Sequence, residues 1–117
     1  VRLRLASPFG SGARLSDGTC GALVGALLVL GLREGFSSPR DVEGRRNLHA
    51  LAGRITSAFA ERNGSVLCRE VSGFDLGTEQ GRAAAHEARV RTMRCVEIVR
   101  TTADLLEGLL TPSKGGH

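Results

Sequence analysis

Three cysteines, Cys20, Cys68 and Cys95, are the residues of this sequence most suited to chemistry. A thiolate is a nucleophile and a metal ligand, so a thiol can serve redox or metal-binding roles. None of the three belongs to a CxxC pair, and their odd number without a visible secretory signal argues against a stable disulfide framework. The simplest interpretation is that they are small buried hydrophobic residues, as free cysteines often are.

The surroundings of two cysteines favour a chemical role over this simple one. We expect Cys20 in the first turn of a helix, where the positive end of the helix dipole favours a thiolate. Cys95 is preceded by Arg94, and Arg91 lies one helical turn earlier, so a cation could stabilise its anionic form. Arginine is common in this chain, and the position of Cys20 is therefore the stronger indication.

Small residues follow Cys20 on one helical face. Gly21 and Gly25 are four residues apart, and Ala22 and Ala26 extend the same surface. A glycine inside a helix costs up to about 1 kcal/mol relative to alanine, so some interaction should offset this cost. Close packing against another helix is one explanation, and close approach of the backbone to a cofactor attached to Cys20 is the other.

Composition and motifs exclude several other functions. The 16 basic and 12 acidic residues give a diffuse net charge of +4, and the absence of Trp and Tyr removes stacking platforms, so we expect no nucleic acid as a partner. The longest apolar run, residues 22–32, is too short to span a membrane, and no signal peptide is visible, which favours a cytoplasmic location. The 10–12 segment is too short for a phosphate loop. Without a Gly-x-Ser-x-Gly elbow, hydrolase chemistry has no residue support.

The elements that must position the cysteines are helices. Helical periodicity predicts segments over 20–32, with Thr19 as N-cap and Gly35 as stop, over 39–63, over 78–90 and from about 95 to 109, with one or two turns within 65–71. Residues 1–6 resemble the end of a further helix, and 10–18 reads as a loop. The 117 residues therefore predict an all-α, single-domain bundle of four to five helices over 1–112, followed by a flexible tail at 113–117.

Three separated motifs resemble one known family. Residues 20–25 read Cys-Gly-Ala-x-x-Gly, residues 63–70 contain Gly-Ser-x-x-Cys-Arg-Glu, and residues 95–99 read Cys-Val-Glu-Ile-Val. In this order they are similar to the four-cysteine family of redox-active proteins that carries a CGAxxG motif, and the resemblance spans nearly the whole chain.

This resemblance implies a cofactor. Members of the family are similar to the iron–sulfur part of split-Soret cytochromes, which implies a cluster held by four cysteines. Cys20, Cys68 and Cys95 match the second, third and fourth of these, with Gly21 and Gly25 against the bound group. The first has no counterpart in the sequence, which begins at Val1 and has Met93 as its only methionine. We expect either that the N-terminal helix is missing or that a different ligand fills this place. Without a CxxCH motif, haem is not expected.

The leading hypothesis is a redox-active, electron-transfer module that holds an iron–sulfur cluster through Cys20, Cys68 and Cys95, with an unknown redox partner. A zinc site completed by water or by a histidine, His49 or His86, is a less favoured form, because both histidines read as surface residues. Two alternatives stay open: a thiol–disulfide redox protein in which Cys68 or Cys95 resolves Cys20, and a helical interaction module with inert cysteines.

A homodimer is also expected. A bundle without its first helix should leave an apolar stripe open, and exposed apolar patches usually find a partner, most often across a two-fold axis. The residues expected to be open lie on two helical stripes: Leu48, Leu51, Ile55 and Phe59, or Leu105, Leu106 and Leu109.

Overall fold

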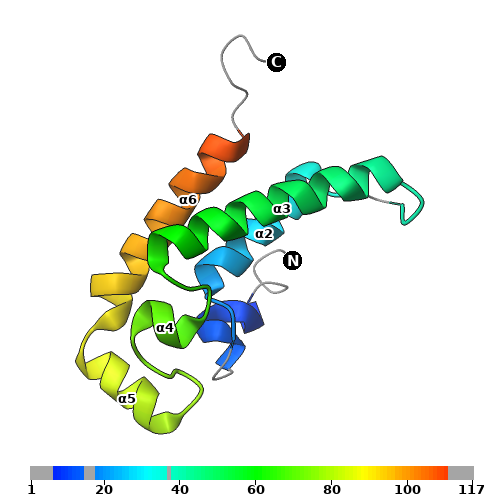
Figure 1. Cartoon of the computed structure of the whole chain (residues 1–117). Coiled ribbons are helices and arrows are strands. Elements are labelled where there is room, and N and C mark those ends of the chain that lie inside the picture. The colour runs from blue at the N-terminus through cyan, green and yellow to red at the C-terminus, as the bar shows by residue number, and fades with distance from the viewer. Residues whose placement is uncertain (1–6, 15–17, 37, 111–117) are drawn as a thin grey trace.

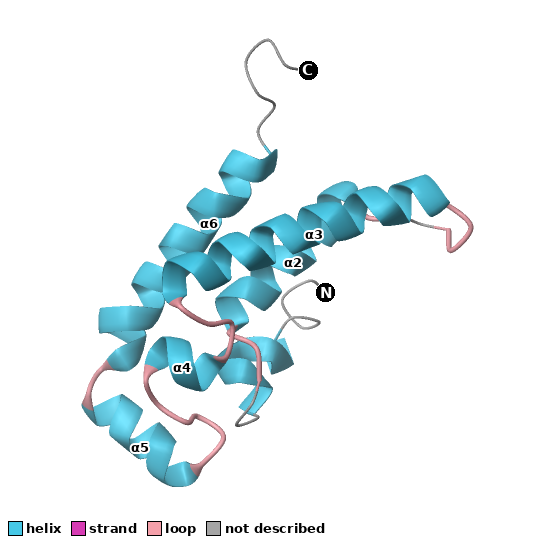
Figure 2. Ribbon diagram, in the orientation of Figure 1, coloured by secondary structure: helices cyan, strands magenta, loops and turns pink. Residues whose placement is uncertain are grey.

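The computed structural model describes residues 7–14, 18–36 and 38–110. Five α-helices make up most of this part of the chain, which contains no β-strand, so the predicted all-α class with four to five helices is confirmed (Figures 1 and 2). The helices are α2 (Gly21–Glu34), α3 (Val42–Asn63), α4 (Cys68–Ser72), α5 (Glu79–Glu87) and α6 (Val96–Leu110). A 3₁₀ helix, η1 (Ser7–Arg14), precedes them, and a π-helix, η2 (Arg91–Cys95), leads directly into α6.

The start of α2 differs from the prediction by one residue. Cys20, and not Thr19, occupies the N-cap, and its side chain makes no capping hydrogen bond. Thr19 instead forms an isolated antiparallel bridge with Leu67, which holds it in extended backbone. The predicted loop over 10–18 is also partly wrong, because η1 covers its first residues. The predicted helix end at 1–6 and the tail at 113–117 lie outside the described residues.

The long helix α3 begins at an aspartate cap rather than at Pro39. Asp41 is the N-cap, and its Oδ1 accepts a hydrogen bond from the Gly44 N–H at 2.8 Å. A carboxylate that accepts this bond satisfies one of the unpaired donors of the first turn, which proline cannot do. The helix ends where predicted, because Gly64 adopts the left-handed conformation with φ of 81°.

The main core lies where α2, α3 and α6 pack against one another (Figure 1). Its largest buried side chains are Leu23, Leu30, Ile55, Phe59, Ile98 and Leu106. Three residues of the stripes expected to be open are buried within the chain: Ile55 is 2% exposed, Phe59 0% and Leu106 8%. For these the expectation was wrong, because the three helices bury each other's apolar faces. The other four are half-buried and pack against this core: Leu48, Leu51, Leu105 and Leu109.

A second, smaller cluster lies at the end of the molecule formed by α4 and α5. Cys68, Leu76, Ala85 and Val90 are buried there, and Cys95 packs against them. The cluster joins the short helices to the start of α6, and it is the part of the fold that carries two of the three cysteines. None of the described helices is both long and apolar enough to cross a membrane.

Candidate functional site: a pocket lined by three cysteines

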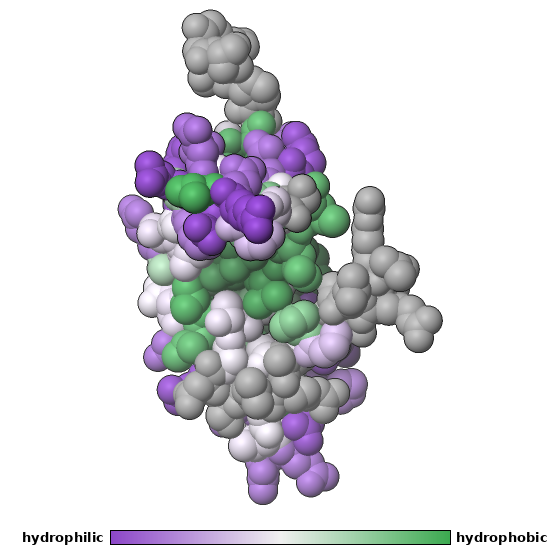
Figure 3. Space-filling view, turned by 90° about the vertical axis from the view of Figure 1, so that its right-hand side faces the viewer, coloured by the Kyte–Doolittle hydropathy of each residue, from purple (hydrophilic) through white to green (hydrophobic). Residues whose placement is uncertain are grey.

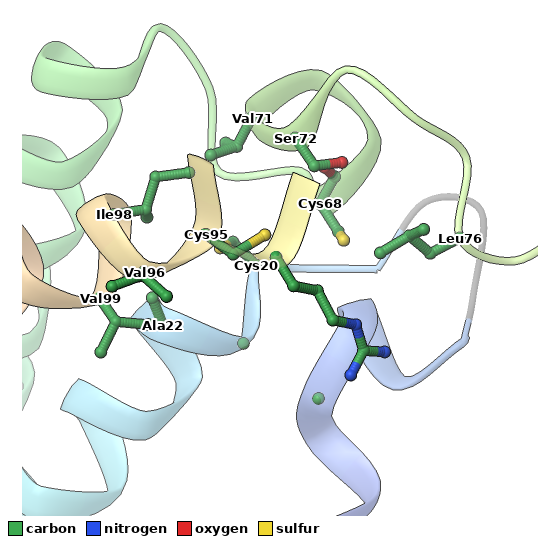
Figure 4. A pocket seen from close by; sticks show the side chains of 13 residues that line it. Cys20, Ala22, Cys68, Val71, Ser72, Leu76, Cys95, Val96, Ile98 and Val99 are labelled. Carbon is green, nitrogen blue, oxygen red and sulfur yellow. The ribbon is translucent and has the colours of Figure 1, made fainter. Parts of the chain in front are cut away.

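The three cysteines, which are far apart in the sequence, line one pocket of about 430 Å³, here named the cysteine pocket. Cys20 comes from the N-cap of α2, Cys68 from the first residue of α4 and Cys95 from the end of η2. Figure 4 shows the Cys68 and Cys95 side chains directed into the same space beside Cys20. The other lining residues are mostly apolar: Gly10, Gly21, Ala22, Val71, Ser72, Leu76, Arg91, Val96, Ile98 and Val99.

A two-residue backbone bridge fixes Cys20 beside Cys68. Thr19 pairs with Leu67, and the hydrogen bonds on either side of this pair involve the cysteines themselves. The Cys20 N–H donates to the Val66 carbonyl at 2.7 Å, and the Cys68 N–H donates to the Gly18 carbonyl at 2.8 Å. Both cysteine backbones are therefore held by the same short bridge, while their side chains stay available to the pocket.

Two buried glycines bring the N-terminal segment against Cys68. Gly12 has φ of +62°, which favours glycine, and a Cβ added there would lie 2.7 Å from the Cβ of Cys68. A Cβ on Gly18 would lie 1.8 Å from the Gly12 carbonyl oxygen. No side chain fits in either place. Sequence reasoning read both residues only as part of a loop.

Cys95 is positioned by η2 and by a hydrogen bond to α4. The Arg94 Nε–H donates to the Val71 carbonyl at 3.0 Å, which ties the end of η2 to the helix that begins with Cys68. Short π-helical segments inside helices are rare and are frequent at functional sites. Here the segment ends on the cysteine itself.

Burial makes two of the thiols hard to ionise. The pKa of Cys68 is raised chiefly by its burial and next by the charge of Cys20, and a hydrogen bond from Ser72 opposes this. The pKa of Cys95 is raised by burial and by Cys20, and Arg91 and Arg94 oppose this. All three cysteines are free thiols. Cys68 and Cys95 are consequently neutral at neutral pH, and each of them interacts with Cys20.

These shifts predict a loss of stability at alkaline pH. Above about pH 9, the unfolded thiol, with a pKa near 9.0, loses its proton, whereas the folded thiol, with its raised pKa, keeps it. The free energy of unfolding therefore falls as pH rises from about 9 toward the pKa of the folded thiols. Few other groups titrate there, because the chain has no tyrosine and Lys114 is its single lysine. Urea denaturation from pH 7 to 10 measures the effect. The decrease in the free energy of unfolding should be smaller in Cys68→Ala. A decrease equal to that of the wild type would show that the Cys68 thiol does not cause it.

Some predicted site residues lie elsewhere. Gly21 lines the cysteine pocket, but Gly25 does not, and a Cβ added at Gly25 would meet nothing within 4 Å. The two histidines considered as ligands, His49 and His86, are exposed. Among the described residues, no three His, Cys, Asp or Glu side chains are arranged to hold a metal ion.

Comparison with known proteins identifies a family. The profile of a family described as "putative redox-active protein (C_GCAxxG_C_C)" matches residues 2–109. No curated protein and no solved structure matches the chain. The family label contains four cysteines, and the 117-residue sequence contains three. All three lie in the matched range and line the cysteine pocket.

Proposed function

We infer a cysteine-based redox function from the premise that this chain belongs to the C_GCAxxG_C_C family, whose description is that of a redox-active protein. The form of that function best supported by the geometry is thiol–disulfide exchange within the cysteine pocket. The observation that carries the proposal is that three free thiols from separate elements line one pocket. Buried cysteines that merely fill a core have no need of a common cavity.

The roles of the thiols follow from their positions. Cys20 occupies the N-cap of α2, at the positive end of the helix dipole, and we assign to it the attack on an external disulfide. The raised pKa values of Cys68 and Cys95 disfavour them as the first attacking thiol. Their place in the same pocket as Cys20 suits them to the second step, in which the disulfide sulfur on Cys20 is close by.

The exchange balances in two steps. The Cys20 thiolate attacks one sulfur of a disulfide R–S–S–R, which forms a mixed disulfide on Cys20 and releases one thiolate R–S⁻. Cys68 or Cys95 then loses its proton and attacks the Cys20 sulfur, which forms an intramolecular disulfide and releases the second R–S⁻. Two electrons pass from the chain to the external disulfide, and the two protons pass to the released thiols.

The test is to treat the reduced, folded chain with the neutral bis(2-hydroxyethyl) disulfide. We expect two of the three thiols to disappear together and one intramolecular disulfide that includes Cys20, identified by intact mass and peptide mapping. The same chain in guanidinium chloride is the control, and there the thiols should react without preference. Three independent mixed disulfides on the folded chain, or no reaction with this or any other disulfide, would overturn the proposal.

An iron–sulfur cluster is the second candidate, favoured by the presence of three thiols, and not two, around one cavity. The donors fit in kind, since clusters are bound by cysteine thiolates, but the described side chains are not arranged as a metal site. Anaerobic incubation with iron and sulfide tests this candidate. If visible absorption and bound iron appear and are lost in each Cys→Ser variant, cluster binding replaces thiol exchange as the function. The zinc alternative is tested by incubation with zinc alone and metal analysis of the protein, because Zn²⁺ is colourless.

A homodimer and a cytoplasmic location stay predictions. The surface available to a dimer differs from the expected one: Leu28, Val29 and Leu32 of α2 are exposed, the last by 62%. Figure 3 shows an apolar area in the middle of the face that it displays. Sedimentation velocity at micromolar concentration measures the oligomeric state.

A further inference from the structure

A second pocket, here named the arginine pocket, adjoins the cysteine pocket. It has a volume of about 560 Å³, and its basic lining residues are Arg82, His86, Arg89 and Arg91. None of the described residues that line it is acidic. Arg91 and Leu76 line both pockets, so the two pockets share part of a wall. A cavity with this lining is suited to an anion.

The backbone at Arg89 is held in an unusual conformation at this pocket. Its φ is 56°, the one positive value among the described residues other than glycine. Hydrogen bonds on both sides maintain it: the Arg89 N–H donates to the His86 carbonyl at 3.1 Å, and the Arg89 carbonyl accepts from Met93 N–H at 2.9 Å. A residue with a side chain is uncommon in the left-handed region, and such residues cluster at functional sites.

We propose that the arginine pocket binds the carboxylate of a low-molecular-weight disulfide or thiol and directs its sulfur toward Cys20. This inference rests on the proposed thiol exchange and names its substrate class. Guanidinium groups bind carboxylates through paired, charge-assisted hydrogen bonds, and Arg82, Arg89 and Arg91 line this pocket. The Arg82 Nη1–H donates to the Leu76 carbonyl at 3.2 Å, which fixes this guanidinium at the pocket wall. Arg91, in the wall shared by the pockets, interacts electrostatically with Cys95, so bound carboxylate and reacting thiols are neighbours.

The test compares three disulfides that differ in charge. Rates of thiol exchange are measured with anionic glutathione disulfide, neutral bis(2-hydroxyethyl) disulfide and cationic cystamine. For each compound, the rate of the variant protein is divided by the rate of the wild type. The variant is Arg89→Asn, because asparagine tolerates a positive φ and the fold is preserved. We expect it to slow the anionic disulfide about tenfold and to leave the neutral one unchanged. High salt should reduce this difference.

The control variant is Arg54→Gln, which removes one exposed charge on α3, away from both pockets, and should leave all three rates unchanged. Equal effects of Arg89→Asn on all disulfides would overturn the arginine pocket and leave the exchange function standing. Absence of exchange with every disulfide would instead refute the function. In that case, binding of S-methylglutathione, which cannot exchange, tests whether the arginine pocket binds a carboxylate. Weaker binding to Arg89→Asn than to the wild type supports the pocket, and no binding to the wild type overturns it.

Discussion

Gly18→Ala is expected to lower the free energy of unfolding by about 3 kcal/mol, because the new methyl group would overlap a backbone carbonyl. Its Cβ would lie 1.8 Å from the Gly12 oxygen, and backbone cannot rotate away as a flexible side chain does. Relief requires the chain around Gly18 to move. The same residue's carbonyl accepts the Cys68 N–H, so the bond that holds Cys68 beside Cys20 weakens with it. Urea denaturation measures the loss.

A matched glycine provides the control for this prediction. Gly53 lies inside α3, where an added Cβ meets nothing within 4 Å. Gly53→Ala should therefore raise the free energy of unfolding by about 0.5–1 kcal/mol through helix propensity alone. If Gly18→Ala were as stable as the wild type, the close approach of Gly18 to the Gly12 backbone would be refuted.

Cys20→Ser is expected to slow the reaction with an external disulfide by at least about tenfold, since the remaining thiols are the ones whose pKa values burial has raised. A serine hydroxyl does not exchange with disulfides, and it leaves the Cys20 N–H to Val66 carbonyl bond intact. The fold should thus be preserved. The measurement is the rate of thiolate release from glutathione disulfide at neutral pH, with stability determined in parallel.

The other two cysteines separate attack from resolution. Either Cys68 or Cys95 resolves the mixed disulfide on Cys20. When the resolving cysteine is replaced, as Cys68→Ser or Cys95→Ser, the first step should proceed and the mixed disulfide should accumulate. The remaining variant should behave as the wild type. A Cys20→Ser protein that reacts at the wild-type rate would show that another thiol attacks first, and would contradict the assignment.

The helical framework was predictable because its signals are local and periodic. The apolar positions that recur along α3, among them Ile55 and Phe59, form its buried face, and Asn63-Gly64 ends the helix as its residue types indicate. Thr78, predicted to begin α5, caps it by accepting the Gly81 N–H. For α3, two cap signals competed: Pro39 and Asp41 both suit a helix start, and the side-chain hydrogen bond of Asp41 decided between them.

The geometry around the cysteines was less predictable, because it depends on contacts between distant residues. The bridge between Thr19 and Leu67 is a single residue pair, which is too short to show the apolar–polar alternation by which a strand is predicted. Gly12 and Gly18 resemble ordinary loop glycines until their close approach is known. Arg89 carries no sign of its positive φ, since glycine or asparagine is the usual residue there. The arginine pocket accordingly had no signal beyond a locally arginine-rich segment.

The Thr19–Leu67 bridge also bears on the order in which the molecule folds. The whole of α2 and α3 lies between its two residues, so the bridge closes a long loop at a substantial cost in chain entropy. Pairing of α2 with α3, which are adjacent along the chain, is expected to come first because nearer contacts cost less to form. A newly made chain with this hairpin formed and the bridge still open carries three independent thiols. The cysteine pocket, which Cys20 and Cys68 line together, forms only when this bridge closes.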